Sequence, residues 1–411
     1  MTSICQISSE IGHLRRVIVH SPGSELLAVT PQTRRHFLYD DLIDLETAAN
    51  EHRLLCAVLA QFADVYQVRS LLEETVQSAE ARSFLLGCVQ ETTAMQALRQ
   101  DIGQKSIDEL LDAVIAGLPF TAGPFAKALE IAEFFLPPLP NLMFIRDAAI
   151  GIGNTLSIGS MRHRARWLEG SIMRTIAGFH PLLRDTPLLY DGSNERHQQL
   201  SLEGGDVHLL SEQTLLIGIS ERTSIAMLDR FSDLIFHQTS IRDILAVVLL
   251  DHRYAIHLDM VLSQIDHGLY AVHPFAFRGP QRAPILHLRR GRQSVTEPID
   301  LWHALKQVGF PGEPVFCGGD NRTSQSREQW ASGCNFFAIR PGLVLSYHRN
   351  EETLQALQKN GFRIVPAETL LRGGLSIGET ERAVITLPVS ELVRGGGGPR
   401  CLTCPITRDN G

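Results

Sequence analysis

The chain has 411 residues, of which 44% are hydrophobic and 20% are charged, as in a globular protein of two or three ordinary domains. Its formal net charge of −7 excludes a general affinity for nucleic acid or for an anionic membrane. The N-terminus lacks a signal-peptide pattern and the longest apolar runs have the length of a strand, so we expect a cytoplasmic protein without a membrane partner. Seven scattered cysteines argue against a disulfide framework.

Five stretches of the chain share one pattern, in which an apolar strand and a tight turn lead to a second strand or a helix. Ser220 and Asn350 are each predicted to cap a helix that follows, and a further strand is predicted at 362–365. Such a repeated unit commonly closes into a ring. The predicted strands are 14–19; 142–145 leading through 150–153 to 155–158; 205–210 with 215–219; 258–262 with 269–272; and 335–339 with 343–345.

One stretch departs from the repeat. Residues 70–136 have helical periodicity, with a capping box formed by Ser106 and Glu109, and prolines at 137, 138 and 140 end the pattern. We interpret 70–136 as a helical insertion that covers one side of a single catalytic domain spanning 1–411.

The C-terminal segment carries four consecutive glycines at 395–398, three residues before Cys401. Without Cβ atoms, this backbone can pass close to a ligand. An apolar lead-in at 383–387 indicates that the tail returns to the body of the protein, where Cys401 would act as a nucleophile in an acid-rich cleft. A flexible tail with an incidental thiol is the alternative interpretation.

Acidic residues and one histidine lie at predicted strand ends, in the segments 144–147, 203–206, 220–223 and 257–259. On a strand, His257 and Asp259 would face the same side. A histidine and acids beside a cysteine are the composition of an activated-thiol site. Taken singly, Asp147 could pair with Arg146 at the surface, 204–206 could be only a turn, and His257 could be a satisfied core histidine.

Metal and nucleotide sites are weaker interpretations. Cys401 and Cys404 have the spacing of a redox pair or of half a zinc site, but Cys317 and Cys334 lie too far apart to supply the second half. The glycine run lacks the Gly-Lys-Ser/Thr ending of a phosphate-binding loop. We therefore expect neither a metal nor a cofactor.

Taken together, these segments resemble the arginine deiminase family over nearly the whole chain. The resemblance implies a five-bladed α/β propeller built from ββαβ modules, with a helical insertion after the first. It also implies hydrolysis of L-arginine to L-citrulline and ammonia through a covalent intermediate on a cysteine. The motifs that carry it are 12–17, 22–23, 40–41, 138–141, 146–147, 203–206, 218–223, 257–260, 327–330 and 401–406.

The resemblance also implies roles for individual residues. It makes Cys401 the nucleophile and His257 the general acid and base. The other roles that it implies are guanidinium binding by Asp147 and Asp259, support of the guanidinium and the histidine by Glu203, and binding of the substrate α-carboxylate by Arg166 and Arg222, with Asn141 beside them.

Three positions depart from the family pattern. Gly396 stands where the family usually has an arginine, Arg400 where it has a histidine, and the turn at 144–148 lacks the usual threonine. The departures bear on substrate choice and pH optimum. The alternatives are therefore a deiminase of another guanidino compound, an amidinotransferase, and a catalytically silent binding protein.

Electrostatics sets one expectation for the thiol of Cys401. Nearby carboxylates should raise its pKa, because like charges disfavour the thiolate, whereas an arriving guanidinium and Arg400 should lower it. The expected partners are a small guanidino compound and further copies of the chain in a homo-oligomer.

Overall fold

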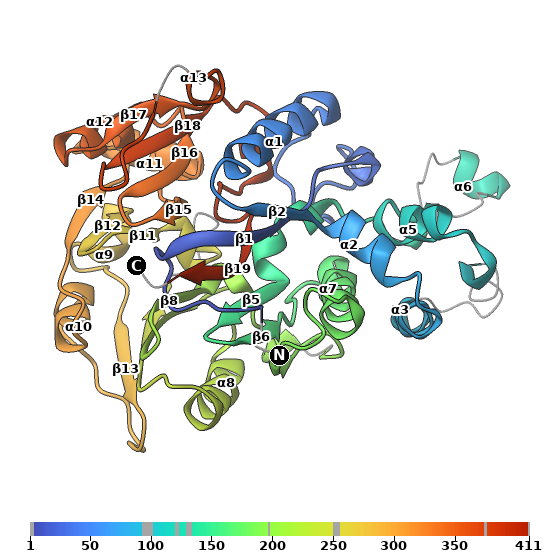
Figure 1. The fold of residues 1–411 in the computed structure, drawn as a ribbon, viewed down its shortest axis with the longest axis horizontal. Helices are drawn as coiled ribbons and strands as arrows, with labels where there is room; N and C mark the ends of the chain where they lie inside the picture. Colours follow the sequence, from blue (N-terminus) through green and yellow to red (C-terminus); the bar gives the residue numbers. More distant parts are fainter. Residues whose placement is uncertain are drawn as a thin grey trace.

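The computed structural model describes residues 4–92, 102–119, 123–128, 134–195, 198–249, 255–373 and 376–409. These residues form a mixed α/β fold whose strands gather toward the middle while α1, α8, α10 and α12 lie around the outside (Figure 1). Six sheets are present in these ranges, and five of them have three or four strands.

Each of these five larger sheets contains the same unit: an antiparallel pair of strands, then a strand parallel to the second one. Helical segments lie between the second and third strands. The first unit is β5 (Ala149–Ile152), β6 (Thr155–Ile158), α7 (Trp167–Phe179) and β7 (Leu188–Asp191), and the second is β8 (Val207–Ser211), β9 (Thr214–Ile219), α8 (Ile225–Gln238) and β10 (Asp243–Val248).

The next two units carry additions to this plan. The third is β11 (Leu262–Asp266), β12 (Leu269–Val272), α9 (Pro274–Phe277), α10 (Leu301–Gln307) and β14 (Glu313–Phe316), and the intervening β13 (Ile285–Arg289) joins the sheet of β10. The fourth follows α11 (Arg322–Trp330) and comprises β15 (Phe337–Arg340), β16 (Leu343–Tyr347), α12 (Glu351–Lys359), β17 (Arg363–Pro366), α13 (Ala367–Leu371) and β18 (Ala383–Leu387).

The fifth unit joins the two ends of the chain. β19 (Cys404–Asp409) pairs antiparallel with β1 (His13–Val19), so that Ile18 lies opposite Cys404. β1 in turn pairs in parallel with β2 (Asp64–Gln67) after the short η1 (Ser24–Ala28) and α1 (Leu45–Leu59). The strand predicted at 14–19 is thus confirmed, and the C-terminal segment returns to the body of the protein as expected.

Four predicted first strands begin too early, including the one predicted at 335–339, which starts only at Phe337. Residues at 142–145, 205–206 and 258–260 lie in 3₁₀ turns, and each strand starts only after its turn. A short buried apolar run is compatible with either structure, so hydrophobicity alone does not separate them. His257 and Asp259 therefore do not share a strand face. The turns are η2 (Pro140–Met143), η3 (Ile145–Asp147), η6 (Gly204–Asp206) and η8 (Leu258–Met260).

The predicted helix caps have mixed outcomes. The capping box of Ser106 and Glu109 is present. Ser224, not Ser220, caps α8, because the Ser220 hydroxyl donates to Asp206 and accepts from the backbone of Arg222. Asn350 occupies the N-cap position of α12 but makes no capping hydrogen bond.

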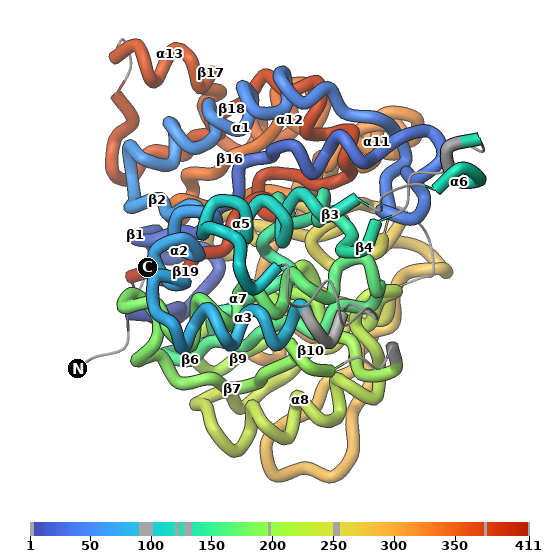
Figure 2. The backbone as a smooth tube through the Cα atoms, turned by 90° about the vertical axis from the view of Figure 1, so that its right-hand side faces the viewer, coloured from blue at the N-terminus to red at the C-terminus, as the bar shows by residue number. Residues whose placement is uncertain are grey.

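The predicted insertion is mainly helical and also contains a small two-stranded sheet. α2 and α3 pack against α7 (Figure 2). Their apolar residues join the same core as those of β5 and β6. Parts of the prediction, at 93–101, 120–122 and 129–133, lie outside the described residues. The elements are α2 (Val68–Thr75), α3 (Ala79–Thr92), α5 (Ile107–Ile115), β3 (Leu118–Pro119), α6 (Pro124–Ala128) and β4 (Phe134–Leu136).

None of the helices within the described ranges combines the length and the apolar composition needed to cross a lipid bilayer.

A buried carboxylate on α1 holds the segment that leads to the glycine run. Glu51 accepts hydrogen bonds from the backbone N–H groups of Ser390, Glu391 and Leu392, the last at 2.8 Å. These donors lie at the start of η9 (Leu392–Gly395), where backbone N–H groups lack intrahelical partners.

We expect Glu51→Gln to lower the free energy of unfolding by about 2 to 3 kcal/mol, because the amide replaces a charged acceptor that serves several buried donors. Denaturant titration measures the change. Glu46→Gln, on the exposed first turn of the same helix, is the control and should change stability by about 0.5 kcal/mol or less. Equal effects of the two substitutions would contradict this role of Glu51.

Candidate active site

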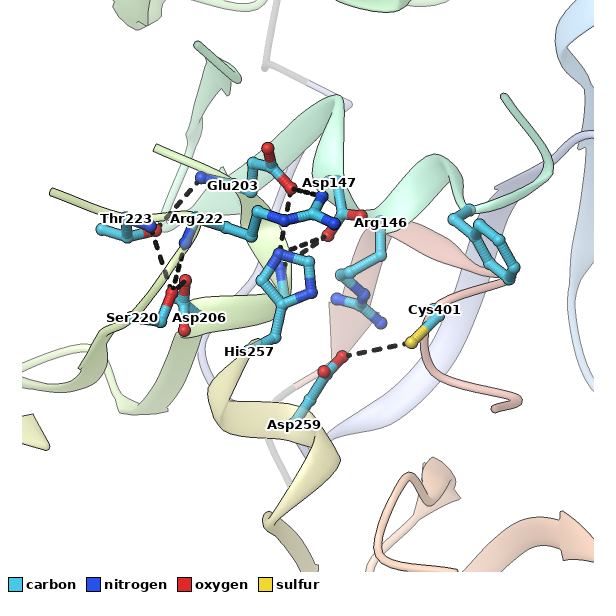
Figure 3. Close-up of polar contacts among 12 residues, drawn as sticks. Arg146, Asp147, Glu203, Asp206, Ser220, Arg222, Thr223, His257, Asp259 and Cys401 are labelled. Atoms are coloured by element: carbon cyan, nitrogen blue, oxygen red, sulfur yellow. Dashed lines mark hydrogen bonds and ion pairs between the residues drawn. The ribbon is translucent and has the colours of Figure 1, made fainter. Parts of the chain in front are cut away.

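The candidate residues meet at one cavity of about 580 Å³ whose lining includes Asp147, His257 and Cys401. Their side chains converge from three successive units and from the C-terminal segment (Figure 3). Asp147 lies in η3, Glu203 directly precedes η6, and His257 and Asp259 lie at the start of η8. The 3₁₀ turns before the strands thus carry the predicted site residues.

The paired glycines at 204–205 are required by the close approach of these turns. A Cβ on Gly204 would lie 2.1 Å from the carbonyl oxygen of Arg146, and one on Gly205 would lie 2.7 Å from Cγ of His257. Any larger residue would push η3 or the imidazole away from η6. Gly204 and Gly205 are therefore part of the site's construction and not only a turn.

Arg166 neutralises the acids behind the cavity. Its Nη1 donates to Asp147 at 2.8 Å and to Glu203 at 3.3 Å, and its Nη2 donates to Glu169 at 2.8 Å. Burial disfavours the charge of Arg166, but Glu169, Asp147 and Glu203 outweigh burial and raise the pKa of its guanidinium. Glu169 was not predicted from the sequence; burial raises the pKa of its carboxyl to about 7 despite Arg166.

Glu203 joins the histidine to this network. Its Oε2 accepts from Nε2 of His257 at 3.0 Å and from Nη1 of Arg222 at 3.3 Å. Burial opposes the charge of Glu203, yet Arg222 and the His257 hydrogen bond hold the pKa of its carboxyl well below the ordinary value. Glu203 is therefore an anion at neutral pH.

His257 is held in its protonated form by these acids. Burial lowers the pKa of the imidazole, but Asp147, with an oxygen 3.7 Å from Nε2, and Glu203 raise the pKa to about 9. At neutral pH the ring is an imidazolium and has a proton to give. Asp206 fixes the turn that carries it, because its carboxylate accepts from the backbone N–H of Leu258 at 2.9 Å.

The thiol of Cys401 lies 3.6 Å from Oδ2 of Asp259. Burial first, and then the charges of Asp259 and Asp147, raise the pKa of the thiol well above its ordinary value. Arg400 lowers the pKa, as predicted, but does not outweigh them. Oδ1 of Asp259 is buried without a hydrogen-bond partner in the described part of the chain, so it is available to a bound cation.

Arg400 is buried and forms hydrogen bonds with residues from distant parts of the chain. Its Nη1 donates to Asp259 at 2.9 Å, and its Nη2 donates to Glu10 at 3.0 Å. It therefore holds one oxygen of Asp259 and leaves the other free. Glu10 was not predicted, because it lies 390 positions from Arg400 in the sequence.

Asn335 is a second site residue that the sequence did not reveal. Its Nδ2 donates to Sγ of Cys401 at 3.2 Å, and its Oδ1 accepts from the backbone N–H groups of Arg400 and Cys401 at 2.9 and 3.2 Å. The sequence placed Asn335 at the first position of a strand, where an asparagine carries no particular signal.

The residues predicted to bind the substrate carboxylate all line the cavity. Nδ2 of Asn141 donates a hydrogen bond to the carbonyl oxygen of Phe37 at 2.8 Å. Arg222 donates through Nη1 and Nε to Glu203 and Glu221. Carboxylate binding by Asn141, Arg166 and Arg222 stays a prediction.

The wall near the glycine run still carries an arginine. Gly396, which replaces the family's usual arginine, has a left-handed backbone with φ of 87°. Two positions earlier, Arg394 lines the cavity and pairs with Asp41 at 2.8 Å.

Asp147, Glu203 and His257 offer ligand atoms within 4.8 Å of one another, which is close enough for a metal ion. Asp147 and Glu203 each already accept a hydrogen bond from Arg166. Glu203 accepts a further hydrogen bond from Arg222. A metal would have to displace these cations, so the arrangement favours an organic cation bound on the cavity side.

Comparison with known sequences gives matches to arginine deiminases. The family model described as arginine deiminase matches residues 124–408. An arginine deiminase of Listeria monocytogenes serotype 4a (strain HCC23) is 31% identical over 431 aligned positions, covering 100% of this chain and 99% of that protein.

Two solved structures are similar in fold. The N-terminal domain of ArgZ, a cyanobacterial arginine dihydrolase bound to product, is 13% identical with a TM-score of 0.53, covering 96% of this chain and 97% of that one. SxtG, an amidinotransferase from Microseira wollei, is 16% identical with a TM-score of 0.52, covering 99% and 98%.

The raised pKa of Cys401 predicts that the thiol of the free protein is protonated at neutral pH and ionises only as the pH rises toward that pKa. A guanidinium ion bound at Asp147 and Asp259 should move the ionisation to lower pH, because it neutralises the carboxylates. The ultraviolet absorbance of the thiolate, taken as the difference between the native protein and Cys401→Ala, measures the ionisation of the thiol without and with the guanidinium ion. A full thiolate at neutral pH without any cation would contradict the prediction.

We expect Asn335→Ala to lower kcat for the reaction at Cys401 by about 10- to 100-fold, because the thiolate loses a hydrogen bond worth roughly 1.5 to 3 kcal/mol. Steady-state kinetics measures the loss, and denaturant titration separates it from a loss of folding. Asn360→Ala, at the exposed end of α12, is the matched control. An unchanged kcat in Asn335→Ala would show that Asn335 does not contribute to the reaction at Cys401.

Proposed function

This chain belongs to the arginine deiminase family, and on that premise we propose that it hydrolyses L-arginine to L-citrulline and ammonia. The observation that carries the proposal is the convergence of Cys401 with an imidazolium and two carboxylates: that of Asp147, which lines the cavity, and that of Asp259, which lies 3.6 Å from the thiol. A thiol facing paired acids suits an electrophile that arrives as a cation, and the guanidinium of arginine is always protonated.

We propose that Asp147 and Asp259 bind the guanidinium nitrogens and turn its carbon toward Sγ of Cys401. Charge-assisted hydrogen bonds of this kind are directional and strong. Oδ1 of Asp259, which has no partner among the described residues, supplies a free acceptor. The bound cation also favours the thiolate, so substrate binding and activation of the nucleophile occur together.

In the first half of the reaction, the thiolate attacks the guanidinium carbon and a C–S bond forms. His257, protonated at neutral pH because its pKa is about 9, gives its proton to the departing nitrogen. The C–N bond breaks, and ammonia leaves. The product of this half is an S-alkylthiouronium on Cys401.

In the second half, His257 is neutral and takes a proton from water. The resulting hydroxide attacks the same carbon. The hydroxyl group of this adduct then loses its proton to solvent as the C–S bond breaks, and the thiolate is released with a ureido product. Glu203 stays ionised throughout and stabilises the imidazolium each time that it forms.

We also propose that the five larger sheets are the blades of a single five-bladed α/β propeller spanning 1–411. Contacts between neighbouring units support the ring: η3 with η6, η6 with η8, β11 with β15, β15 with β1, and β19 with β5. The last two contacts involve the sheet that joins both ends of the chain. The expected cytoplasmic location and homo-oligomer stay predictions.

An amidinotransferase is the second candidate. Gly396 and Arg400 depart from the deiminase pattern, and the amidinotransferase SxtG has a similar fold. In that reaction an amine in place of water would accept the amidino group from Cys401, and arginine would leave ornithine without ammonia. The two candidates therefore differ in their products.

We expect the native protein to release ammonia and citrulline in equal amounts from L-arginine, and Cys401→Ala to release neither above background. Cys404→Ala is the control, because Cys404 donates its S–H to the carbonyl of Ala149 and does not line the cavity. Product analysis on a panel of guanidino compounds, with and without an amine acceptor, is the measurement. Ornithine without ammonia would favour the amidinotransferase, and full activity in Cys401→Ala would end the proposal.

A further inference from the structure

Arg400 is shared by two carboxylates, and only one of them, that of Asp259, belongs to the proposed reaction centre. Nε and Nη2 of Arg400 donate to Oε2 and Oε1 of Glu10 at 3.1 and 3.0 Å, so this pair is bidentate. Nη1 donates to Oδ2 of Asp259 at 2.9 Å. The guanidinium thus bridges a carboxylate beside the thiol and a carboxylate of the N-terminal segment.

Glu10 is the stronger of the two partners. Burial disfavours the charge of Arg400, but Glu10 first and Asp259 second raise the pKa of its guanidinium above the ordinary value. Burial also acts against the charge of Glu10. Arg400 first, and then Arg146 and His208, outweigh burial and hold the pKa of the Glu10 carboxyl well below its ordinary range. Both members of the pair are therefore charged at neutral pH.

Backbone contacts fix this pair in place. Nη2 of Arg400 also donates to the carbonyl oxygen of Val207 at 2.8 Å, and the backbone N–H of Glu10 donates to the carbonyl oxygen of Leu209 at 2.7 Å. Val207 and Leu209 both lie in β8, so one strand holds both partners. Arg400 cannot turn away from Glu10 without giving up these contacts.

The sharing of Arg400 matters because a substrate guanidinium would bind the same carboxylate. In the proposed function, Asp259 holds Arg400 through one oxygen and the substrate through the other. A single carboxylate does not neutralise two cations, and like charges at one site repel each other. The charge of Glu10 balances that of Arg400, which leaves the charge of Asp259 for the substrate.

We propose that Glu10 is a positioning residue that acts through Arg400: by balancing the charge of Arg400, it allows Asp259 to accept a cationic substrate. The inference rests on the proposed function, in which Asp259 binds the guanidinium, and it adds to that function a determinant of substrate affinity from the N-terminal segment. Without the charge of Glu10, Arg400 becomes a competitor of the substrate for Asp259.

The first test measures the binding of L-arginine by calorimetry in a Cys401→Ala background, where the nucleophile is absent. We expect Glu10→Gln to weaken binding by about 10- to 30-fold, because the unbalanced charge of Arg400 repels the guanidinium. Binding of L-citrulline, which has a neutral ureido group on the same chain, should change by about twofold or less. Glu10→Asp keeps the charge and should restore most of the affinity for L-arginine.

Combining Glu10→Gln with Arg400→Gln separates charge balance from a loss of structure. The double variant lacks one negative and one positive charge, so its affinity for L-arginine should return to within about threefold of that of the Cys401→Ala protein. Two independent structural defects would add instead of cancelling. Asp409→Asn is the matched control, because Asp409 pairs with the exposed Arg15 on the sheet of β1 and β19. It should leave the affinity unchanged.

Ionisation of the thiol in the ligand-free protein is a second measurement. Titratable groups that interact electrostatically with the thiol of Cys401 include Asp259, Asp147, Arg400 and Tyr347. Glu10→Gln should move the ionisation to lower pH, because Arg400 lowers the pKa of the thiol and loses its counter-ion. Arg400→Gln should move the ionisation to higher pH. The rate of alkylation by iodoacetamide against pH, corrected for the rate in Cys401→Ala, measures both shifts.

Four results would overturn the inference: an unchanged affinity for L-arginine in Glu10→Gln, equal losses for L-arginine and L-citrulline, a double variant that binds no better than Glu10→Gln, or shifts of the thiol ionisation in the same direction in the two single variants. Denaturant titration gives the folded fraction of each variant, so binding is compared at equal concentrations of folded protein.

Neither measurement requires turnover, which separates this inference from the proposed function. If Cys401→Ala binds L-arginine and Glu10→Gln weakens that binding selectively, the inference holds. If the native protein then releases no ammonia or citrulline from L-arginine, the proposed reaction alone fails. If Cys401→Ala does not bind L-arginine, both fail.

Discussion

The structure depends on keeping several carboxylates ionised in a place with little water. An isolated buried carboxylate would be protonated, because burial disfavours charge. Arg166 and Arg222 prevent this for Glu203, and Arg166 also pairs with Asp147. The site therefore consists of acids whose charge is balanced by two buried arginines, both of which also line the cavity.

This arrangement couples the charge of the ligand to the protonation state of the Cys401 thiol. In the free protein the acids and burial hold Cys401 in its protonated form. The acids also hold His257 protonated against the effect of burial, so in the proposed reaction the general acid carries its proton before any substrate binds. In the proposed function, a bound guanidinium counteracts this effect on the thiol because it offsets the charges of the acids.

The position of each site residue follows from the repeated unit. In the first three units the first strand is preceded by a 3₁₀ turn, and successive turns pack so closely that only glycine is accommodated at Gly204 and Gly205. Asp147, His257 and Asp259 are displayed from these turns, while Cys401 enters on the segment before β19. Pairing of β19 with β1 anchors that segment, so the ends of the chain are as important to the site as its middle.

The sequence by itself determined the repeat, most of the second strands, the strand at 14–19 and the motif residues Cys401, His257, Asp147, Asp259 and Glu203, because these depend on local hydrophobic pattern and short motifs. Only the tertiary structure decided that 142–145 and 258–260 are turns, and that Asn335 contacts the thiol. It also decided the partners: Glu10 meets Arg400 across 390 positions, and Arg166 is enclosed by acids. Hydrogen bonds and charge pairs act through space, whereas sequence patterns report only on neighbours along the chain.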